Sequence, residues 1–339
     1  MIKQAASFLR GTDTERFLFA DGLTGDQPTT FQVPRDDFDM TLATGARAAG
    51  VDVRFGQQVD GVEFTGNGAV VAVTDLETES TYRVDAGFVL DCSGNGRVLP
   101  RLLDLEIPTS LPERVACYCH VEHDDRPTGD LEGDIWICVH PDNGWIWIIP
   151  FSNGRTSVGM ICDREYWDAR PGNSREKLFE FLREEPNARR RLGRAVPVTP
   201  SRELRGYSTR VKAFHGAGWA LAGNATGFLD PVFSSGVCLA LETAWLSSAL
   251  IDRSLSGEIV DWSHEYDRVV NRAFDVFLAF VEGWYRRDLE DIFFAETKLH
   301  RIRQFITSIL GGNVLRSDNP LATDSVDGLR QLHESIARS

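Results

Sequence analysis

The 339-residue sequence lacks several features that would define other classes of protein. It has no apolar run of the roughly eighteen residues that a membrane-spanning helix needs. Residues 1–11 lack the charged and then apolar pattern of a secretory signal. Positive charge is in deficit, since 36 Lys and Arg face 50 Asp and Glu and leave a net charge of −14. Phosphate backbones bind basic surfaces, so no nucleic-acid partner is expected.

The six cysteines form no C-x-x-C pair and lie in apolar or strand-like stretches. This predicts buried free thiols and a reducing, cytoplasmic location. Two of the cysteines lie close to two histidines in the sequence, in the group Cys117, Cys119, His120 and His123. On a strand His120 would point away from the other three, and no second ligand pair follows at zinc-site spacing. We therefore expect no metal, and His120 is a candidate for lining a substrate cavity.

Periodicity predicts mixed helices and strands. A helix is expected at 35–50, where Phe38, Leu42, Ala46 and Ala49 recur at the spacing of one buried face. Strands are expected at 51–64, 69–74 and 81–90, then a glycine turn at 93–96 and a helix at 97–105. Further strands are expected within 113–162, 203–209 and 218–222, and helices at 174–184, 187–192, 234–255 and after 261.

This order predicts an α/β protein with three parts. Residues 1–112 and 201–256 form a nucleotide-binding core. Residues 113–200 form an antiparallel sheet that offers a broad face to a ligand. Residues 257–339 form a helical region crowded with aromatic side chains.

The stretch 219–237 is the richest in candidate chemistry. A strand runs into a Gly-Asn turn, an Asp-Pro loop follows, and Ser-Ser-Gly opens a long helix. The N-terminus of a helix offers unpaired N–H groups and a positive dipole end, which suit an anion. The alternative is an ordinary helix start with Ser234 or Ser235 as the N-cap.

The same stretch resembles the second FAD-contacting motif of the FAD-dependent monooxygenase superfamily. Its form Asp-Pro-Val-Phe-Ser-Ser-Gly-Val is closest to the flavin-dependent halogenase branch. The resemblance implies that Gly223 and Asn224 meet the ribityl–diphosphate region, with Asn224 in the place of an aspartate. It also implies that Asp230 and Pro231 reach the isoalloxazine ring. The further contacts it implies are to halide at Ser235 and Gly236, and to flavin at Gly236 and Val237.

Other segments fit this superfamily. Residues 33–42 resemble its R-x-x-F-D-x-x-L helix, in which Arg35 would approach the cofactor. The strand with Val59 corresponds to the adenine side, and residues 88–94 resemble the strand and turn that close on the dinucleotide. Without the resemblance, Arg35 would be a solvated residue at a helix start.

The segment Gly144-Trp-Ile-Trp-Ile-Ile-Pro150 resembles the halogenase signature W-x-W-x-I-P. Trp145 and Trp147 alternate along a strand, so both indoles project from one face. The resemblance implies that they wall the route by which an intermediate leaves the flavin. An isolated W-x-W would instead indicate two core tryptophans.

The segment Lys3-Gln-Ala-Ala-Ser-Phe8 resembles the K-x-G-A-x-F stretch with the family's active-site lysine, Ala5 replacing the glycine. The resemblance implies that Lys3 hydrogen-bonds hypohalous acid or forms a haloamine, and burial would lower its pKa. Taken alone, such a lysine would be a solvated tail residue. Residues 231–233 hold no glutamate of the kind that tryptophan halogenases use, which points to the phenol/pyrrole-type branch.

The superfamily's opening G-x-G-x-x-G turn is also missing, since Gly94-Asn-Gly96 follows a later strand and lacks the third glycine. A βαβ unit takes at least about 30 residues. We therefore expect the Rossmann-like FAD-binding core to be N-terminally incomplete, and its flavin binding to be weakened.

The resemblance implies FADH2- and O2-dependent halogenation in secondary metabolism, on a phenolic or pyrrolic substrate that is free or tethered to a carrier protein. A separate flavin reductase would supply reduced FAD, with chloride or bromide as co-substrate. The basic run Arg189–Arg191 with Arg194 is a solvated helix face or a docking site for an acidic carrier protein. The alternatives are an FAD-dependent monooxygenase, a geranylgeranyl-reductase-like oxidoreductase and an inactive truncated fragment.

Overall fold

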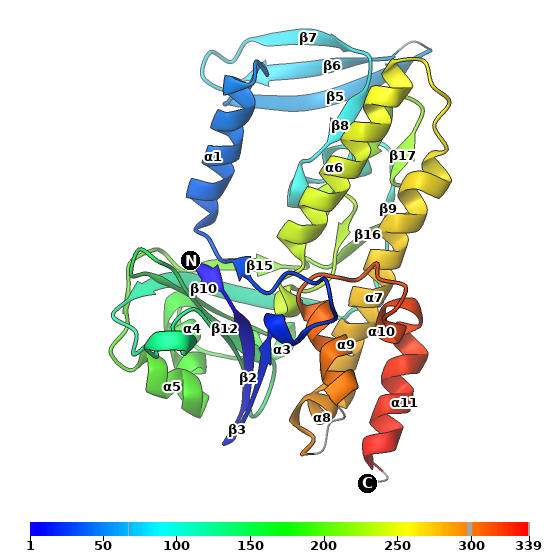
Figure 1. The fold of residues 1–339 in the computed structure, drawn as a ribbon. Coiled ribbons are helices and arrows are strands. Elements are labelled where there is room, and N and C mark those ends of the chain that lie inside the picture. The colour runs from blue at the N-terminus through cyan, green and yellow to red at the C-terminus, as the bar shows by residue number, and fades with distance from the viewer. Residues whose placement is uncertain (67, 297–299, 338–339) are drawn as a thin grey trace. The chain divides into compact units, whose positions relative to one another are not determined.

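The computed structural model describes residues 1–66, 68–296 and 300–337 (Figure 1). The chain divides into two compact units. Unit 1 contains Met1–Arg35, Leu111–Tyr207 and Val276–Ser339, and unit 2 contains Asp36–Ser110 and Ser208–Asp275. None of the helices in the described part combines the length and apolarity that a bilayer crossing requires.

Unit 1 is built on a mainly antiparallel sheet. Residues 113–162 form four strands of it, which confirms the predicted series of strands and turns. In spatial order the sheet contains β14 (Val196–Pro197), β10 (Arg114–Glu122), β13 (Thr156–Asp163), β12 (Trp145–Pro150), β11 (Ile135–Val139), β2 (Ala5–Arg10) and β3 (Asp13–Leu18). A further strand, β15 (Arg202–Arg205), also pairs with β10.

The compact units differ from the three parts expected from the sequence. Met1–Arg35 lie with the sheet, whereas we placed them in the nucleotide-binding core. The reason is backbone pairing, because a strand belongs to the sheet that satisfies its N–H and C=O groups. Ala6–Leu9 pair in parallel with Ile135–Cys138, and β3 extends the same edge. The predicted helical region is divided as well, since residues 257–275 fall in unit 2.

One face of the unit 1 sheet packs against α4 (Ser174–Glu184) and α5 (Pro186–Leu192). Alternate residues of β10, β12 and β13 point to this face, as strand geometry requires. The buried thiols Cys117, Cys119, Cys138 and Cys162 belong to this core. Cys92 and Cys238 are exposed, against expectation, because they lie beyond a strand end and on an open helix face.

Aromatic residues hold the C-terminal helices of unit 1 against β2 and β3. Phe8 lies 5.8 Å from Phe17, 5.5 Å from Trp284 and 4.7 Å from Phe293 between ring centroids. Trp284 lies in the last turn of α7 (Arg268–Tyr285), and Phe293 lies on α8 (Asp288–Phe294). The remaining helices of the region are α9 (His300–Leu310), α10 (Pro320–Thr323) and α11 (Ser325–Ala337).

The described residues of unit 2 form three small sheets. The first is the antiparallel set β5 (Gln57–Thr65), β6 (Gly68–Asp75) and β7 (Thr81–Ala86). In the second, β8 (Val89–Asp91) pairs in parallel with β18 (Trp219–Leu221), which also pairs with β17 (His215–Gly216). The third joins β16 (Thr209–Val211) to β9 (Glu106–Ile107) and β19 (Gly227–Phe228). The predicted long helix is α6 (Gly236–Leu255).

Helix α1 (Arg35–Ala48) begins where the sequence predicts, but its apolar side is not buried. No residue of α1 is buried, and Leu42 is 49% exposed. The expected burial of Phe38, Leu42, Ala46 and Ala49 is therefore wrong. Periodicity identifies the apolar side of a helix without identifying a partner, and the described elements pack only sparsely against α1.

Candidate functional site

The two tryptophans of β12 project from the same face of the unit 1 sheet, opposite the face that α4 and α5 cover. Their ring centroids lie 5.7 Å apart. Trp145 is 1% exposed, whereas Trp147 is only half-buried. Trp147 is thus the member of the pair that offers indole surface in unit 1.

Trp147 lies over a glycine of the neighbouring strand. Its register partner on β13 is Gly159, whose own partner on β10 is Tyr118. A Cβ added at Gly159 would lie 2.2 Å from the indole, so the ring occupies the space that a side chain would fill. The Trp147 indole N–H donates to Ser157 Oγ at 3.1 Å, and the ring lies 6.1 Å from that of Tyr118. His120, half-buried on the same face, contacts Phe151 edge-on.

Trp145 is fixed by Tyr285 and Arg114, neither of which the sequence identified as a site residue. Its indole N–H donates to Tyr285 Oη at 3.1 Å, and the guanidinium of Arg114 lies 3.4 Å from the centre of the Tyr285 ring. Arg114 is held in turn by Asp163 at 2.6 Å. A cation above a tyrosine face is stabilising, so this stack orients the buried tryptophan. The stretch of C-terminal aromatics hinted at Tyr285, but no local pattern identified Arg114.

Lys3 is buried, with only 7% of its surface exposed. Its ammonium nitrogen lies 5.3 Å from the centre of the Phe19 ring. Burial lowers the pKa of Lys3 from 10.5 to about 8, because an apolar surrounding disfavours the charged form. A substantial fraction of this amine is therefore uncharged near pH 8, which an exposed lysine would not achieve.

A two-stranded ribbon carries Lys3. It pairs β1 (Ile2–Lys3) with β4 (Thr30–Phe31), and Gln32 follows directly. The Gln32 amide nitrogen donates to Pro150 O at 2.6 Å, which ties the ribbon to the last residue of the tryptophan strand. Lys3 and the tryptophan strand are thus linked within unit 1 by hydrogen bonds.

In unit 2 two turns lie side by side, each after a parallel strand. The turn Gly94–Gly96 follows β8, and the turn Gly223–Ala225 follows β18. The amide of Asn224 donates to Asn95 Oδ1 at 3.4 Å. The Asp91 carboxylate shapes the first turn by accepting the N–H groups of Ser93 and Leu99, each at 2.7 Å. The carboxyl ends of parallel strands are where open α/β sheets bind their ligands.

The start of α6 lies beside the second turn. The Gly223 N–H donates to Thr243 Oγ1 on α6 at 2.8 Å, and a Cβ added at Gly236 would lie 3.9 Å from Asn224 Oδ1. Ser235 occupies the N-cap position, but its side chain makes no cap hydrogen bond. An ordinary helix start would have a serine side chain as its N-cap, and α6 begins without this hydrogen bond at Ser235. The first N–H groups of the helix therefore suit an anionic partner.

The remaining predicted flavin contacts lie at several places. Asp230 is buried and accepts the Val232 N–H at 3.0 Å, so its carboxylate shapes the loop at Pro231. Val59 lies on β5, 40% exposed, next to a register shift toward Gly61. Val237 lies in the first turn of α6, and Arg35 is the first residue of α1. Unit 2 thus brings Asn224 and Gly236 together, whereas Val59 lies on a different sheet.

These features fit part of a flavin site. Gly94 has φ +60°, and a Cβ there would meet open space, so the backbone of the first turn is accessible to a ligand. With the Gly223–Ala225 turn and the α6 N-terminus, this cradle suits the ribityl and ring portions of FAD. Among the described residues, no group of three His, Cys, Asp or Glu side chains could hold a metal ion.

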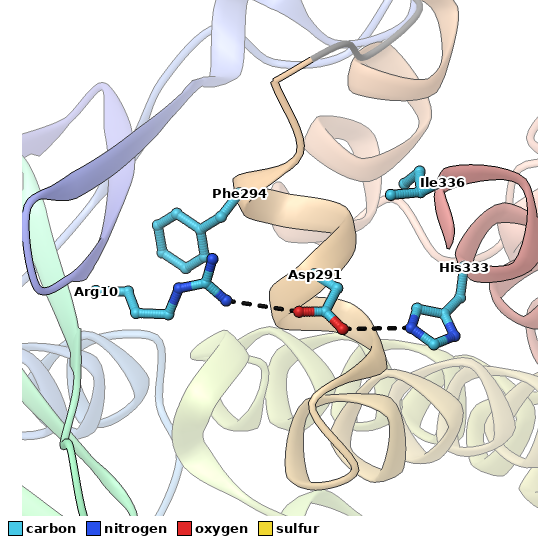
Figure 2. Close-up of a pocket in the computed structure, with 5 residues that line it drawn as sticks. All are labelled: Arg10, Asp291, Phe294, His333 and Ile336. Carbon is cyan, nitrogen blue, oxygen red and sulfur yellow. Dashed lines mark hydrogen bonds and ion pairs between the residues drawn. The ribbon is translucent and has the colours of Figure 1, made fainter. Parts of the chain in front are cut away.

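A separate shallow hollow of about 280 Å³ lies at α8 and α11 (Figure 2). In it Asp291 pairs with Arg10 at 3.6 Å and with His333 at 3.3 Å, while Arg10 covers the Phe294 ring. Exposed ion pairs of this kind are weak. None of the predicted site residues lines the hollow, so we assign it no role in the site.

Fold and turns together define a mixed α/β flavoprotein architecture with an added antiparallel sheet. A tryptophan halogenase family model matches residues 18–310. A crystal structure of a flavoprotein/dehydrogenase from Cytophaga hutchinsonii is 34% identical, with a TM-score of 0.95, and the match covers 99% of this chain and 82% of that one. The chain therefore belongs to the tryptophan halogenase family of flavin-dependent halogenases.

Two curated relatives indicate the range of substrates within this family. A 1H-pyrrole-2-carbonyl-[peptidyl-carrier protein] chlorinase of Pseudomonas fluorescens is 28% identical over 85% of this chain and 65% of its own length. A tryptophan 2-halogenase of Chondromyces crocatus is 30% identical over 68% of this chain and 45% of its own. The chain thus spans 65% and 45% of the lengths of these two enzymes.

Proposed function

We propose that this protein halogenates a phenolic or pyrrolic substrate, with FAD as cofactor, chloride or bromide as co-substrate and Lys3 as the residue that delivers the halogen. The observation that carries the proposal is the buried amine of Lys3, whose pKa is lowered to about 8, on a ribbon bonded to the end of the tryptophan strand. The carrier-protein chlorinase among the relatives supports the pyrrole class, with a tethered substrate.

The proposed roles follow from the chemistry of each residue. Asn224, Gly223, Asp230 and the start of α6 would hold FAD, and the N–H groups at Ser235 and Gly236 would hold halide. Reduced FAD, supplied by a separate reductase, would activate O2 as the oxidant that converts halide to hypohalous acid. Lys3 would hydrogen-bond the hypohalous acid or form a haloamine, and the indole of Trp147 would limit access of water to it.

Replacing the lysine tests the proposal. With FAD, a flavin reductase and bromide, Lys3→Ala should abolish halogenation of a phenol or a pyrrolyl carrier protein while FADH2 oxidation continues at the wild-type rate. Lys177→Ala, which changes an amine on α4 near Trp167, is the matched control and should retain both activities. Halogenated product from Lys3→Ala, measured by mass spectrometry, would contradict the assigned role.

A second candidate is oxidation or reduction of a substrate without halide, as in FAD-dependent monooxygenases and geranylgeranyl-reductase-like enzymes. The crystal structure with a TM-score of 0.95 is described as a flavoprotein/dehydrogenase, which favours this candidate. Turnover of the substrate at the same rate with and without chloride or bromide would support this second candidate function. A purified chain that stays colourless with added FAD would instead support an inactive fragment.

The candidate docking site for a carrier protein at 189–194 contains fewer available arginines than the sequence predicted. Arg191 is 1% exposed, bonds Asp124 at 3.2 Å and covers the Trp136 ring at 4.4 Å. The prediction that these arginines form a solvated helix face is therefore wrong for Arg191. Its side chain is buried because the Asp124 carboxylate pairs with it and the Trp136 ring packs against it. Arg189, Arg190 and Arg194 are exposed and remain the candidates. Reversing their charges should weaken turnover of a carrier-bound substrate more than that of a free one.

A further inference from the structure

Gln32 is a buried amide that connects three segments of unit 1. Only 7% of its surface is exposed. Its amide nitrogen donates to Pro150 O at 2.6 Å and to Gly133 O at 3.1 Å. Pro150 ends β12, and Gly133 precedes β11, so both N–H groups are used to join the ribbon to the sheet.

The carbonyl oxygen of the same side chain is free. Gln32 Oε1 is buried and has no hydrogen-bond partner among the described residues. Buried acceptors are nearly always paired, so this oxygen is open to a further hydrogen bond that costs it none of its existing ones. The backbone of Gln32 is already fixed, since it exchanges two hydrogen bonds with Met1 at 2.9 and 3.0 Å.

Strand geometry places the Lys3 side chain on the same side of the ribbon as Gln32. Gln32 lies opposite Met1, and Lys3 lies opposite Thr30, so Lys3 and Gln32 are diagonal neighbours. Such pairs are about 7–8 Å apart at Cα, within reach of long side chains. The other side of the ribbon faces solvent, since Ile2 is 53% and Phe31 is 70% exposed.

We propose that Gln32 is a positioning residue for Lys3: its amide N–H groups hold the ribbon on the end of the tryptophan strand, and its unpaired carbonyl oxygen, on the same side of the ribbon, is the acceptor toward which the Lys3 amine turns when it acts. An amine that donates to this oxygen directs its lone pair elsewhere, toward an incoming electrophile. An amide achieves this without charge, whereas a carboxylate would favour the protonated amine. The importance of this for halogenation rests on the function proposed above.

The pKa of Lys3 itself reports on Gln32. The chain has four lysines, so lysine labelled with ¹³C and ¹⁵N gives few NMR signals, and Lys3→Arg identifies the one from Lys3. In Gln32→Glu the pKa of Lys3 should rise from about 8 to 10.5 or above, because a carboxylate on the same side of the ribbon favours the charged amine. In Gln32→Met, which has the same length without donors or acceptor, the pKa should rise toward 10.5 as the ribbon loosens and water reaches the amine.

Gln27 provides matched controls, because it is an exposed glutamine in the same N-terminal segment. Gln27→Glu and Gln27→Met should leave the pKa of Lys3 unchanged. If Gln32 only held the ribbon, Gln32→Glu and Gln32→Met would raise the pKa of Lys3 to the same value, because both variants lose the N–H groups that bond Pro150 and Gly133. The proposal is overturned if folded Gln32→Glu keeps the wild-type pKa of Lys3, or if Lys3 titrates near 10.5 in the wild type.

The titration of Lys3 distinguishes a failure of the Gln32 proposal from a failure of the proposed halogenase function. Should Gln32→Met fail to fold, Gln32→Glu decides, with near-ultraviolet circular dichroism as the check that the fold is intact. If Lys3→Ala still halogenates, the proposed role of Lys3 fails, yet the dependence of its pKa on Gln32 can still be measured. If the pKa of Lys3 does not respond to Gln32 while Lys3→Ala abolishes halogenation, only the positioning role fails.

Discussion

At the scale of single residues, Gly159 determines where the Trp147 ring lies. Alanine at this position would place its Cβ 2.2 Å from the indole, so the ring has to move to admit it. We expect Gly159→Ala to displace Trp147, break its 3.1 Å hydrogen bond to Ser157 and lower the free energy of unfolding by about 1–3 kcal/mol. Urea denaturation followed by tryptophan fluorescence measures both effects.

Gly45→Ala is the control for this substitution. A Cβ at Gly45 would meet nothing within 4 Å, and the residue lies within α1. Alanine favours a helix over glycine by up to about 1 kcal/mol, so this variant should be unchanged or slightly more stable. Equal stability of Gly159→Ala and wild type would show that Trp147 does not rest on Gly159.

At the scale of elements, His140 fixes the turn between β11 and β12 to α4. Its Nδ1 accepts the N–H groups of Asp142 and Asn143, each at 3.3 Å, and its Nε2 lies 3.1 Å from Glu184 on α4. The ring also stacks on Phe181, with 3.9 Å between centroids. Burial lowers the pKa of His140 from 6.5, although the Glu184 carboxylate acts in the opposite direction. The neutral ring is the form that fits, since Nδ1 must accept.

This arrangement predicts acid sensitivity of the turn. The folded state binds the His140 proton less tightly than the unfolded state, so stability is complete above pH 6.5 and falls as the pH drops below it toward the folded pKa. Chemical denaturation between pH 5 and 8 should show this loss, and His140→Gln should reduce the slope. His300→Gln, at an exposed histidine, should leave the slope as in the wild type.

Local sequence patterns predicted local elements well. The four strands between 114 and 163, the start of α1 and the long helix α6 follow from periodicity and turn residues. Partners far away in the sequence could not be predicted in this way. The parallel pairing of β2 with β11 and the burial of Arg191 over Trp136 depend on such partners.

In the candidate site, too, local motifs predicted some features, whereas others depend on partners that are distant in the sequence. The motifs located the tryptophan strand and the turn at Gly223, but no pattern around Gln32 signalled its burial. A single glutamine between Phe31 and Val33 looks the same in the sequence whether solvent or two carbonyl groups accept hydrogen bonds from its amide. Only the fold distinguishes these cases, through its contacts with Pro150 and Gly133.

At the scale of the whole molecule, some tryptophans of the described residues are buried in the core and others are exposed at the surface. Trp284 is 2% exposed among Phe8 and Phe293 in unit 1, whereas Trp245 on α6 in unit 2 is 71% exposed. Trp284→Ala should therefore lower the free energy of unfolding by about 3–5 kcal/mol. Trp245→Ala should change it by no more than about 0.5 kcal/mol.

Denaturant titration of both variants provides the comparison. Because the chain has two compact units, the transitions are best followed with two probes, circular dichroism and tryptophan fluorescence. A large loss of stability in Trp245→Ala would show that another surface covers this indole in solution.

The parallel pairing of β2 with β11 also has a consequence for biosynthesis. During translation, β2 emerges long before Ile135–Val139 exist to receive it, and α9, which packs near Phe19, is made later still. Until then Lys3 is an ordinary hydrated lysine on a nascent chain. A translation product that ends before β11 cannot form this pairing, so its Lys3 would keep the pKa of an exposed lysine.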